Sequence, residues 1–220
     1  MARILIIDNY DSFTYNLVHY VDEYRVHQTE VYRNDRIGLE KINDYDGILL
    51  SPGPGIPSEA GKLLEIIDKY KETKRIFGVC LGLQAIAEVF GGSLLNTSKV
   101  YHGVATEINV LEPAHYLFRG LPGRFTAGRY HSWVVRNDSV PDCMQVNALD
   151  DEQQIMAMSH RRLDVCGVQF HPESILTPQG KDIVFNWLAK FDETVAHPSE
   201  PSGYGSAAGR EPAGNPETDH

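Results

Sequence analysis

Three short motifs place residues that could perform acyl-transfer chemistry at the ends of apolar segments. The first is Gly78-Val79-Cys80-Leu81-Gly82, in which a glycine lies two residues to either side of a cysteine. This G-x-C-x-G pattern is typical of a nucleophile elbow, a strained strand-to-helix turn that exposes its central side chain. The N-terminus of the following helix would stabilise a thiolate. Taken alone, the pattern fits a buried core cysteine equally well.

A histidine and a glutamate follow another apolar run and could complete a hydrolytic triad. Residues 168–173 read VQFHPE, so His171 and Glu173 come at the end of a predicted strand. Ligand sites of open α/β sheets lie at the carboxyl edge of parallel strands, where Cys80 is also expected. A histidine oriented by a carboxylate activates a nearby nucleophile. His171 alone fits a surface loop, but together with Cys80 it predicts a Cys80–His171–Glu173 triad.

A third segment, Ser51-Pro52-Gly53-Pro54-Gly55, could supply backbone N–H groups at the same edge. Glycines allow the backbone to approach a ligand closely, and an N–H from here and that of Leu81 could bind a developing oxyanion. A rigid turn is the alternative interpretation. The segment is not a phosphate loop, because no G-K-[ST] follows it. The nine histidines include no H-E-x-x-H pair, so no metal site is expected, and Cys143 and Cys166 are interpreted as structural.

The elements that position these motifs alternate between strand and helix. Apolar runs typical of buried strands occupy residues 3–7, 47–51, 76–80 and 164–170, and residues 30–33 are interpreted as a further strand. Apolar residues recur at helical spacing over residues 13–24, 59–70, 83–90 and 180–191. Asp11 or Ser12 is expected to cap the first helix, and alternation indicates antiparallel strands over residues 104–110 and 125–135. The pattern predicts an α/β fold: an open, mostly parallel sheet with flanking helices and a smaller antiparallel β segment.

Composition limits the class of protein. The chain has 220 residues, and we expect one domain over residues 1–193 and a disordered Pro/Gly/Ser-rich tail over 194–220. A net charge of −10 disfavours nucleic-acid binding. No apolar run reaches the roughly 20 residues of a membrane helix, and no signal peptide is evident. Three widely spaced cysteines form no disulfide framework, so a cytoplasmic location is expected.

These motifs together resemble a known family. GVCLGLQAIAEVFGG, SPGPG and VQFHPES are similar to the motifs of class I, triad-type glutamine amidotransferase domains. More narrowly, DNYDSFTYN, GRYHSW and HPESILTPQGK resemble the glutaminase subunits of anthranilate synthase and of aminodeoxychorismate synthase. The resemblance runs from residue 1 to about residue 190 and implies a class I glutamine amidotransferase-like fold.

The resemblance implies a role for each matching residue. Cys80 would attack the glutamine carboxamide to form a γ-glutamyl thioester, His171 would transfer protons and Glu173 would orient His171. The backbone N–H groups of Gly53 and Leu81 would form the oxyanion hole. The other positions expected to bind L-glutamine are Pro54, Gly55, Gln84, Ser132 and Trp133. No cofactor is implied in this chain, whereas Mg²⁺ is expected on the partner synthase subunit.

The resemblance also implies a partner. Ammonia would pass to the large (component I) subunit of anthranilate synthase, which converts chorismate to anthranilate in tryptophan biosynthesis. The alternatives are the same role with the aminodeoxychorismate synthase large subunit, in folate biosynthesis, and a stand-alone cysteine-dependent γ-glutamyl hydrolase. A degenerate binding module is disfavoured because the three triad residues are intact.

Some positions are expected to affect contacts with the partner subunit rather than catalysis. Docking is expected at Asn9 to Ser12 and at residues 56–58, which follow strands at the active-site edge. Leu83, Val104 and Trp133 depart from commoner family patterns. We expect these departures to affect partner contacts or the pocket rim rather than catalysis.

Overall fold

The computed structural model describes residues 1–24, 27–97 and 99–195. The strands are β1 (Arg3–Asp8), β2 (Gln28–Arg33), β3 (Gly47–Leu50), β4 (Arg75–Val79), β5 (Leu94–Asn96), β6 (Val104–Val110), β7 (Arg124–Arg129), β8 (Trp133–Val135), β9 (Met144–Asp150), β10 (Ile155–His160) and β11 (Val165–Val168). The α-helices are α1 (Thr14–Glu23), α2 (Leu63–Tyr70), α3 (Leu81–Val89) and α4 (Gly180–Val195). Short 3₁₀ helices cover Leu39–Asp44, Pro57–Glu59, Tyr116–Phe118 and Asn137–Ser139.

A nine-stranded sheet organises the chain, in the order β2-β1-β3-β4-β11-β10-β9-β6-β7. The first five strands are parallel to one another, whereas each later strand is antiparallel to its neighbours. β5 and β8 form a separate antiparallel pair. The predicted mostly parallel α/β fold is confirmed, and the antiparallel part is largely a continuation of the same sheet.

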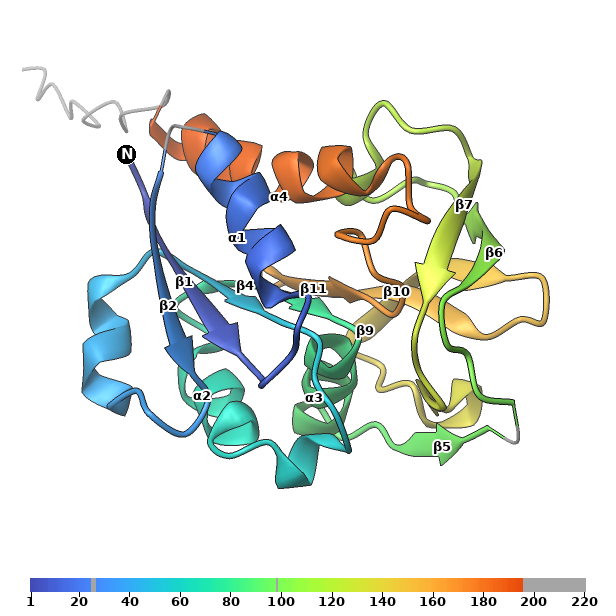
Figure 1. Cartoon of the computed structure of the whole chain (residues 1–220), viewed down its shortest axis with the longest axis horizontal. Helices are drawn as coiled ribbons and strands as arrows, with labels where there is room; N and C mark the ends of the chain where they lie inside the picture. The colour runs from blue at the N-terminus through green and yellow to red at the C-terminus, as the bar shows by residue number, and fades with distance from the viewer. Residues whose placement is uncertain (25–26, 98, 196–220) are drawn as a thin grey trace, which may run out of the picture.

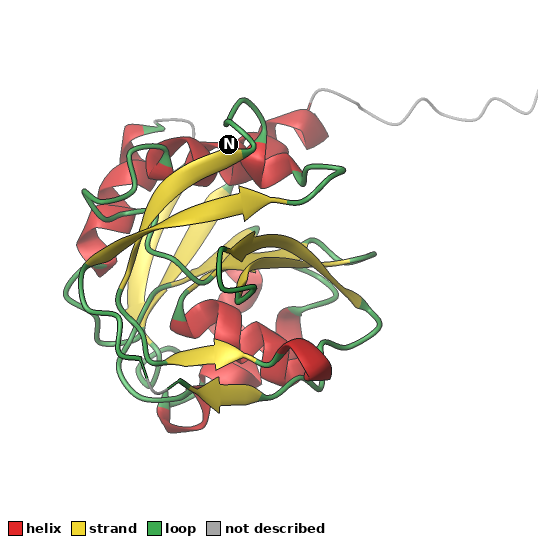
Figure 2. Cartoon of the chain, turned by 90° about the vertical axis from the view of Figure 1, so that its right-hand side faces the viewer, coloured by secondary structure: helices red, strands yellow, loops and turns green. Residues whose placement is uncertain are grey.

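Helices cover both faces of the parallel strands, as Figure 1 shows, with α1 and α4 on one face and α2 and α3 on the other. Successive strand residues point to opposite faces. Ile4 and Ile6 of β1 accordingly join the core under α1 and α4, and Leu5 and Ile7 join the core under α2 and α3. Seen after a quarter turn, the strands form a curved layer between the helices (Figure 2). Burial on both faces explains the continuous apolar runs in the sequence.

Three local expectations need correction. α1 has Phe13 at its N-cap with no side-chain cap, and Asp11 Oδ1 instead accepts a hydrogen bond from the Phe13 N–H at 2.7 Å. α2 begins at Leu63 rather than near residue 59, because Pro57–Glu59 forms a 3₁₀ turn and Gly61 has a φ of +55°. α4 continues to Val195. The predicted tail from residue 196 onward lies outside the described residues.

None of the helices in the described ranges is both long and apolar enough to span a membrane.

Candidate active site

Cys80 occupies the sharp turn between β4 and α3. It is the only residue between them, and its backbone adopts φ 53° and ψ −101°. Such a positive φ is strained for a residue with a side chain and persists only where surrounding structure holds it. The Cys80 N–H donates to the carbonyl of Val168 at 2.8 Å, which ties the turn to β11. The thiol therefore lies at the N-terminus of α3, as the elbow motif predicts.

The glycines of the motif allow the turn to pack against its neighbours. A Cβ at Gly78 would lie 2.5 Å from the carbonyl carbon of Gly82, and one at Gly82 would lie 2.7 Å from the carbonyl oxygen of Leu50. Both distances are shorter than any tolerable contact, and the opposing atoms are backbone atoms that cannot move aside. Small residues are required at both positions for α3 to approach the sheet.

We therefore expect Gly78→Ala to lower stability by about 1–3 kcal/mol, as overpacking of a close-packed site does. For a domain of this size, such a loss corresponds to a fall in melting temperature of several degrees. Gly38→Ala is the matched control, because no atom lies within 4 Å of a Cβ built there. Thermal unfolding of the two variants measures the difference, and equal melting temperatures would contradict the packing argument.

His171 and Glu173 form a buried pair just beyond the end of β11. Glu173 Oε1 lies 2.6 Å from Nδ1 of His171. Glu173 is 3% exposed and His171 is 2% exposed. The His171 backbone N–H donates to the carbonyl of Gly128 at 2.9 Å, and the Thr177 hydroxyl donates to the His171 carbonyl at 2.7 Å. These contacts fix the ring, so the geometry gives Glu173 the predicted orienting position.

The second ring nitrogen of His171 is left for chemistry. Nε2 is buried and makes no hydrogen bond with the described residues. Burial by itself would lower the pKa of His171, but the negative charges of Cys80 and Glu173 outweigh burial and raise that pKa well above its ordinary value. The site therefore favours an imidazolium at His171, which can serve as the proton donor of a Cys–His pair.

A cavity of about 130 Å³ opens beside Cys80. The cavity is lined by Cys80, by two residues that were not predicted, Tyr130 and His131, and by the predicted substrate-binding residues other than Leu81: Gly53, Pro54, Gly55, Gln84, Ser132 and Trp133. Leu81 itself is buried at the start of α3, where the first N–H groups of a helix have no intrahelical acceptor. The structure thus brings Cys80 and the Gly53–Gly55 loop, distant in sequence, to one cavity. His171 and Glu173 do not line this cavity, and their motif instead contacts the sulfur of Cys80 through Gln169.

Two glutamine side chains tie the cavity walls together. Gln84 Nε2 donates to the carbonyl of Trp133 at 2.9 Å and to Gln169 Oε1 at 3.2 Å. Gln169 Nε2 in turn donates to the sulfur of Cys80 at 3.5 Å. Gln169 was not predicted as a site residue, although it lies two positions before His171. Its amide supports negative charge on the sulfur.

Asn9 has a different position from the one expected of it. It is 2% exposed, so it offers no docking surface. Its N–H donates to Ser51 Oγ at 2.9 Å, and its Nδ2 donates to the Ser51 carbonyl at 2.7 Å. Asn34 Nδ2 donates to Asn9 Oδ1 at 3.0 Å, which fixes the amide. Asn9 therefore holds the loop that carries Gly53, where a Cβ would meet Asn9 at 2.6 Å.

The remaining singled-out residues lie in several environments. Cys166 is buried in β11, where burial raises the pKa of its thiol, and such a thiol is inert. Leu83 is fully buried beneath Gly167 and cannot reach a partner, whereas Val104 is 40% exposed. Pro57 is buried and Ile56 is half-buried, so of the predicted docking segment 56–58 only Ser58 is exposed.

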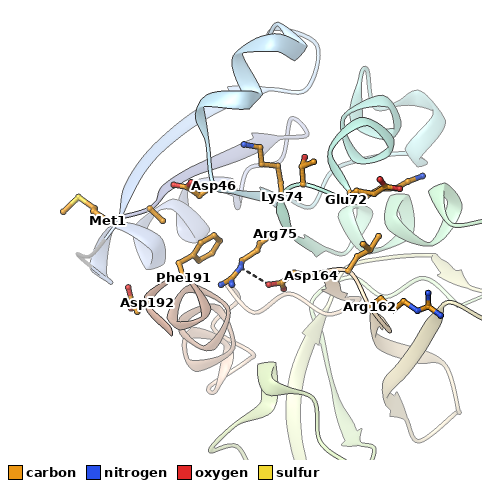
Figure 3. Close-up of a pocket in the computed structure, with 13 residues that line it drawn as sticks. Met1, Asp46, Glu72, Lys74, Arg75, Arg162, Asp164, Phe191 and Asp192 are labelled. Atoms are coloured by element: carbon orange, nitrogen blue, oxygen red, sulfur yellow. Dashed lines mark ion pairs between the residues drawn. The ribbon is translucent and has the colours of Figure 1, made fainter. Parts of the chain in front are cut away.

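A larger cavity, about 490 Å³, lies at the opposite edge of the sheet, where the parallel strands begin (Figure 3). An ion pair of 2.9 Å between Arg75 and Asp164 and the ring of Phe191 border it. None of the residues predicted to act in chemistry lines this cavity. We take the smaller cavity as the candidate active site because it contains the Cys80 thiol. It also lies at the carboxyl edge of the parallel strands, where α/β folds bind ligands.

Comparisons with known proteins agree with this geometry. The family model described as "Glutamine amidotransferase class-I" matches residues 5–191. A solved structure from Thermoplasma acidophilum, described as a subunit of GMP synthase, is similar with a TM-score of 0.78 and 28% identity. The match covers 90% of this chain and 98% of that one.

Curated relatives are more similar in sequence. The "Aminodeoxychorismate/anthranilate synthase component 2" of Bacillus subtilis is 43% identical, over 87% of this chain and 98% of that protein. The "Anthranilate synthase component 2" of Pseudomonas aeruginosa is 43% identical, over 84% and 94%. The "Aminodeoxychorismate synthase component 2" of Escherichia coli is 46% identical, over 84% and 98%. By these matches, the chain belongs to the class I glutamine amidotransferase family.

Proposed function

We propose that this chain is the glutaminase subunit of anthranilate synthase. It hydrolyses L-glutamine and passes the ammonia to a large subunit that converts chorismate to anthranilate. The observation that carries the chemistry is the strained turn that places Cys80 at a small cavity, together with the buried His171–Glu173 pair whose imidazole interacts with the charge of Cys80. The names of the relatives, which are components of two-part synthases, support the role of a subunit.

The proposed reaction proceeds through a thioester. The Cys80 thiolate attacks the carboxamide carbon, and the resulting oxyanion accepts hydrogen bonds from the N–H groups of Gly53 and Leu81. His171 gives its Nε2 proton to the departing ammonia, which leaves a γ-glutamyl thioester on Cys80. His171 then takes a proton from water as the water attacks the thioester, and glutamate leaves while the thiolate is restored.

Every group in this sequence of steps comes from the chain itself, so we propose that it needs no cofactor. The Mg²⁺ that the family resemblance implies would belong to the partner synthase subunit. Gln84, Ser132 and Trp133, which line the cavity together with the Gly53–Gly55 loop, would hold the glutamine backbone. The reactive thiol is suited to a reducing compartment, and we propose the cytoplasm.

The identity of the partner has one serious alternative. The Bacillus subtilis relative carries the names of both synthases, and the Escherichia coli relative is named for aminodeoxychorismate synthase alone. The same chain could therefore serve the large subunit of aminodeoxychorismate synthase. A stand-alone γ-glutamyl hydrolase is not favoured, because these relatives are named as synthase components.

Reconstitution distinguishes these functions. The purified chain is mixed with each of the two large subunits, chorismate and glutamine, and the aromatic product is identified. We expect glutamine-dependent anthranilate formation with the anthranilate synthase large subunit. Formation of aminodeoxychorismate alone would establish the alternative, and full glutamine hydrolysis without either subunit would favour the stand-alone hydrolase.

We infer that the partner covers the rim of the active site, because ammonia must cross without meeting water. Exposed apolar side chains follow β1 and β11, two of the parallel strands that end at this edge of the sheet. Ile175, two residues beyond Glu173, is 95% exposed, Tyr15 near the start of α1 is 70% exposed, and Tyr10 after β1 is 46% exposed. Phe13, between the two tyrosines in sequence, packs its ring 6.2 Å from that of His171. Apolar residues exposed together in this way are typical of a protein interface.

Ile175→Asp is therefore expected to weaken binding of the large subunit by about tenfold or more, since burying an unpaired carboxylate at an interface is costly. Glutamine hydrolysis by the free chain should be unchanged. Glu72→Lys, on the exposed surface at the opposite edge of the sheet, is the control and should bind normally. Affinity is measured by titrating the large subunit, and unaltered affinity in Ile175→Asp would place the interface elsewhere.

A further inference from the structure

A buried charged network lies directly behind one wall of the cavity. Arg129, at the end of β7, is 1% exposed, and its guanidinium lies 3.7 Å from the ring centre of Tyr101. Its NH1 donates to Asp150 Oδ2 at 2.5 Å, and its NH2 donates to Gln154 Oε1. Its Nε donates to Nε2 of His131 at 3.0 Å. Each nitrogen of the guanidinium therefore has a partner, and one of those partners lines the cavity.

The Asp150 carboxylate, which pairs with Arg129, is also held by hydrogen bonds. Oδ1 of Asp150 accepts hydrogen bonds from the backbone N–H groups of Glu152 and Gln154, at 2.9 and 2.7 Å. The carboxylate is thereby anchored in the turn between β9 and β10. A buried guanidinium whose three nitrogens each bind a different partner is held in one orientation, and removing one partner from such a network is strongly destabilising. The network can therefore hold His131 in one orientation.

The contact with Arg129 also fixes the protonation of His131. Arginine only donates hydrogen bonds, so Nε2 of His131 must be the unprotonated acceptor and the proton must be on Nδ1. Burial, followed by the positive charges of Arg129 and His171, lowers the pKa of His131 to about 3. His131 is neutral wherever the enzyme would work. It adds no second positive charge beside His171, and its Nε2 is not available as a base.

His131 begins the three-residue segment that forms this wall of the cavity. The backbone carbonyls of the segment accept hydrogen bonds from three different parts of the chain. Tyr101 N–H donates to His131 at 3.0 Å, and Thr97 N–H donates to Ser132 at 2.7 Å. Gln84 Nε2 donates to Trp133 at 2.9 Å. The imidazole of His131 is the side-chain anchor of the same segment, and Arg129 holds that anchor.

We propose that His131 is a positioning residue for glutamine, held by Arg129 and Asp150 so that Ser132 and Trp133 keep the spacing that the substrate requires. The inference rests on the proposed function, because it concerns the same cavity. It assigns His131 to substrate binding and not to proton transfer. Loss of the contact should therefore impair recognition of glutamine while the reactivity of the Cys80 thiol is retained.

Two substitutions at position 131 distinguish the effect of the hydrogen bond to Arg129 from the effect of side-chain size. His131→Gln keeps an acceptor oxygen that can reach Nε of Arg129, whereas His131→Leu leaves that buried donor without a partner. Arg129→Lys also removes the hydrogen bond to His131. Lysine keeps a cation beside Asp150 but lacks the planar guanidinium whose Nε reaches His131. Thermal unfolding shows which variants are folded and qualify for the comparison.

Alkylation of Cys80 by two reagents gives the readout. A chloromethyl ketone with the carbon skeleton of glutamine needs the cavity, whereas iodoacetamide needs only the thiol. We expect His131→Leu and Arg129→Lys to react with the chloromethyl ketone about tenfold or more slowly than the unsubstituted chain. His131→Gln should stay within about threefold. All variants should react with iodoacetamide at the unsubstituted rate.

The possible outcomes are distinct. Equal chloromethyl ketone rates in the unsubstituted chain and in the folded variants among His131→Leu and Arg129→Lys would overturn the positioning role. Slowing with both reagents would also overturn it, since His131 would then act on the thiol. If the unsubstituted chain reacts with iodoacetamide but not with the chloromethyl ketone, the glutamine site itself, and the proposed function with it, would be wrong.

Discussion

Cys80→Ala is expected to abolish glutamine-dependent synthesis, with a loss on the order of 10⁴-fold to 10⁶-fold, as removal of a nucleophile from a triad produces. The reason is geometric, because Cys80 is the only residue between β4 and α3 and lines the cavity. Cys166→Ala is the control, since that thiol is buried in β11 away from this cavity. Glutamate release in the reconstituted complex measures the loss.

The same variant should leave the partner's own chemistry intact. Ammonia added directly does not pass through the thioester, so ammonia-dependent synthesis by the complex with Cys80→Ala should proceed at the unsubstituted rate. A drop in both activities would indicate that the complex fails to assemble. Retained glutamine hydrolysis in Cys80→Ala, or its loss in a folded Cys166→Ala, would overturn the assignment of the nucleophile.

Glu173→Gln is expected to lower kcat for glutamine hydrolysis by about 10²-fold to 10⁴-fold, the range that loss of the orienting carboxylate produces in a triad. Glu173 Oε1 lies 2.6 Å from Nδ1 of His171 and fixes both the ring and its tautomer. An amide can accept one hydrogen bond in its place but carries no charge. Glu72→Gln, an exposed glutamate at the opposite edge of the sheet, is the matched control.

The pH dependence of the residual activity gives a second readout. The charges of Cys80 and Glu173 overcome burial and raise the pKa of His171, so the imidazolium is present at neutral pH and is lost as the pH rises through that raised value. Glu173→Gln removes one of the two causes and lowers the pKa of His171. The alkaline fall in activity should therefore begin at lower pH in Glu173→Gln. An unshifted alkaline limb would contradict the electrostatic role of Glu173.

Much of the parallel half of the fold could be predicted because its signals are local. β1, β3 and β4 are buried on both faces, so each appears as a continuous apolar run. The β9–β10 hairpin was missed. All residues of β10 except the last are buried, and the register with β9 shifts twice, so neither strand shows the alternation that marks a half-exposed strand.

The candidate site likewise contains residues that local sequence signals predict and residues that only the tertiary structure identifies. Cys80, His171 and Glu173 lie in short motifs at strand ends, where residue type and position suffice to suggest a role. Arg129 and Asp150 are charged residues that sequence reasoning assigns to the surface, yet they are buried together because β7 and β9 flank β6 in the sheet. Only the tertiary pairing reveals that they hold His131.

The most direct test of the account follows the amide nitrogen of glutamine. The complex of this chain with the anthranilate synthase large subunit receives chorismate, glutamine labelled with ¹⁵N at the amide and an excess of unlabelled ammonium, and the anthranilate is analysed by mass spectrometry. The account predicts anthranilate that carries the label in far greater proportion than the free ammonium pool does, and no labelled product with Cys80→Ala. Product labelled only to the level of the free ammonium would show that the chain does not pass ammonia to the synthase.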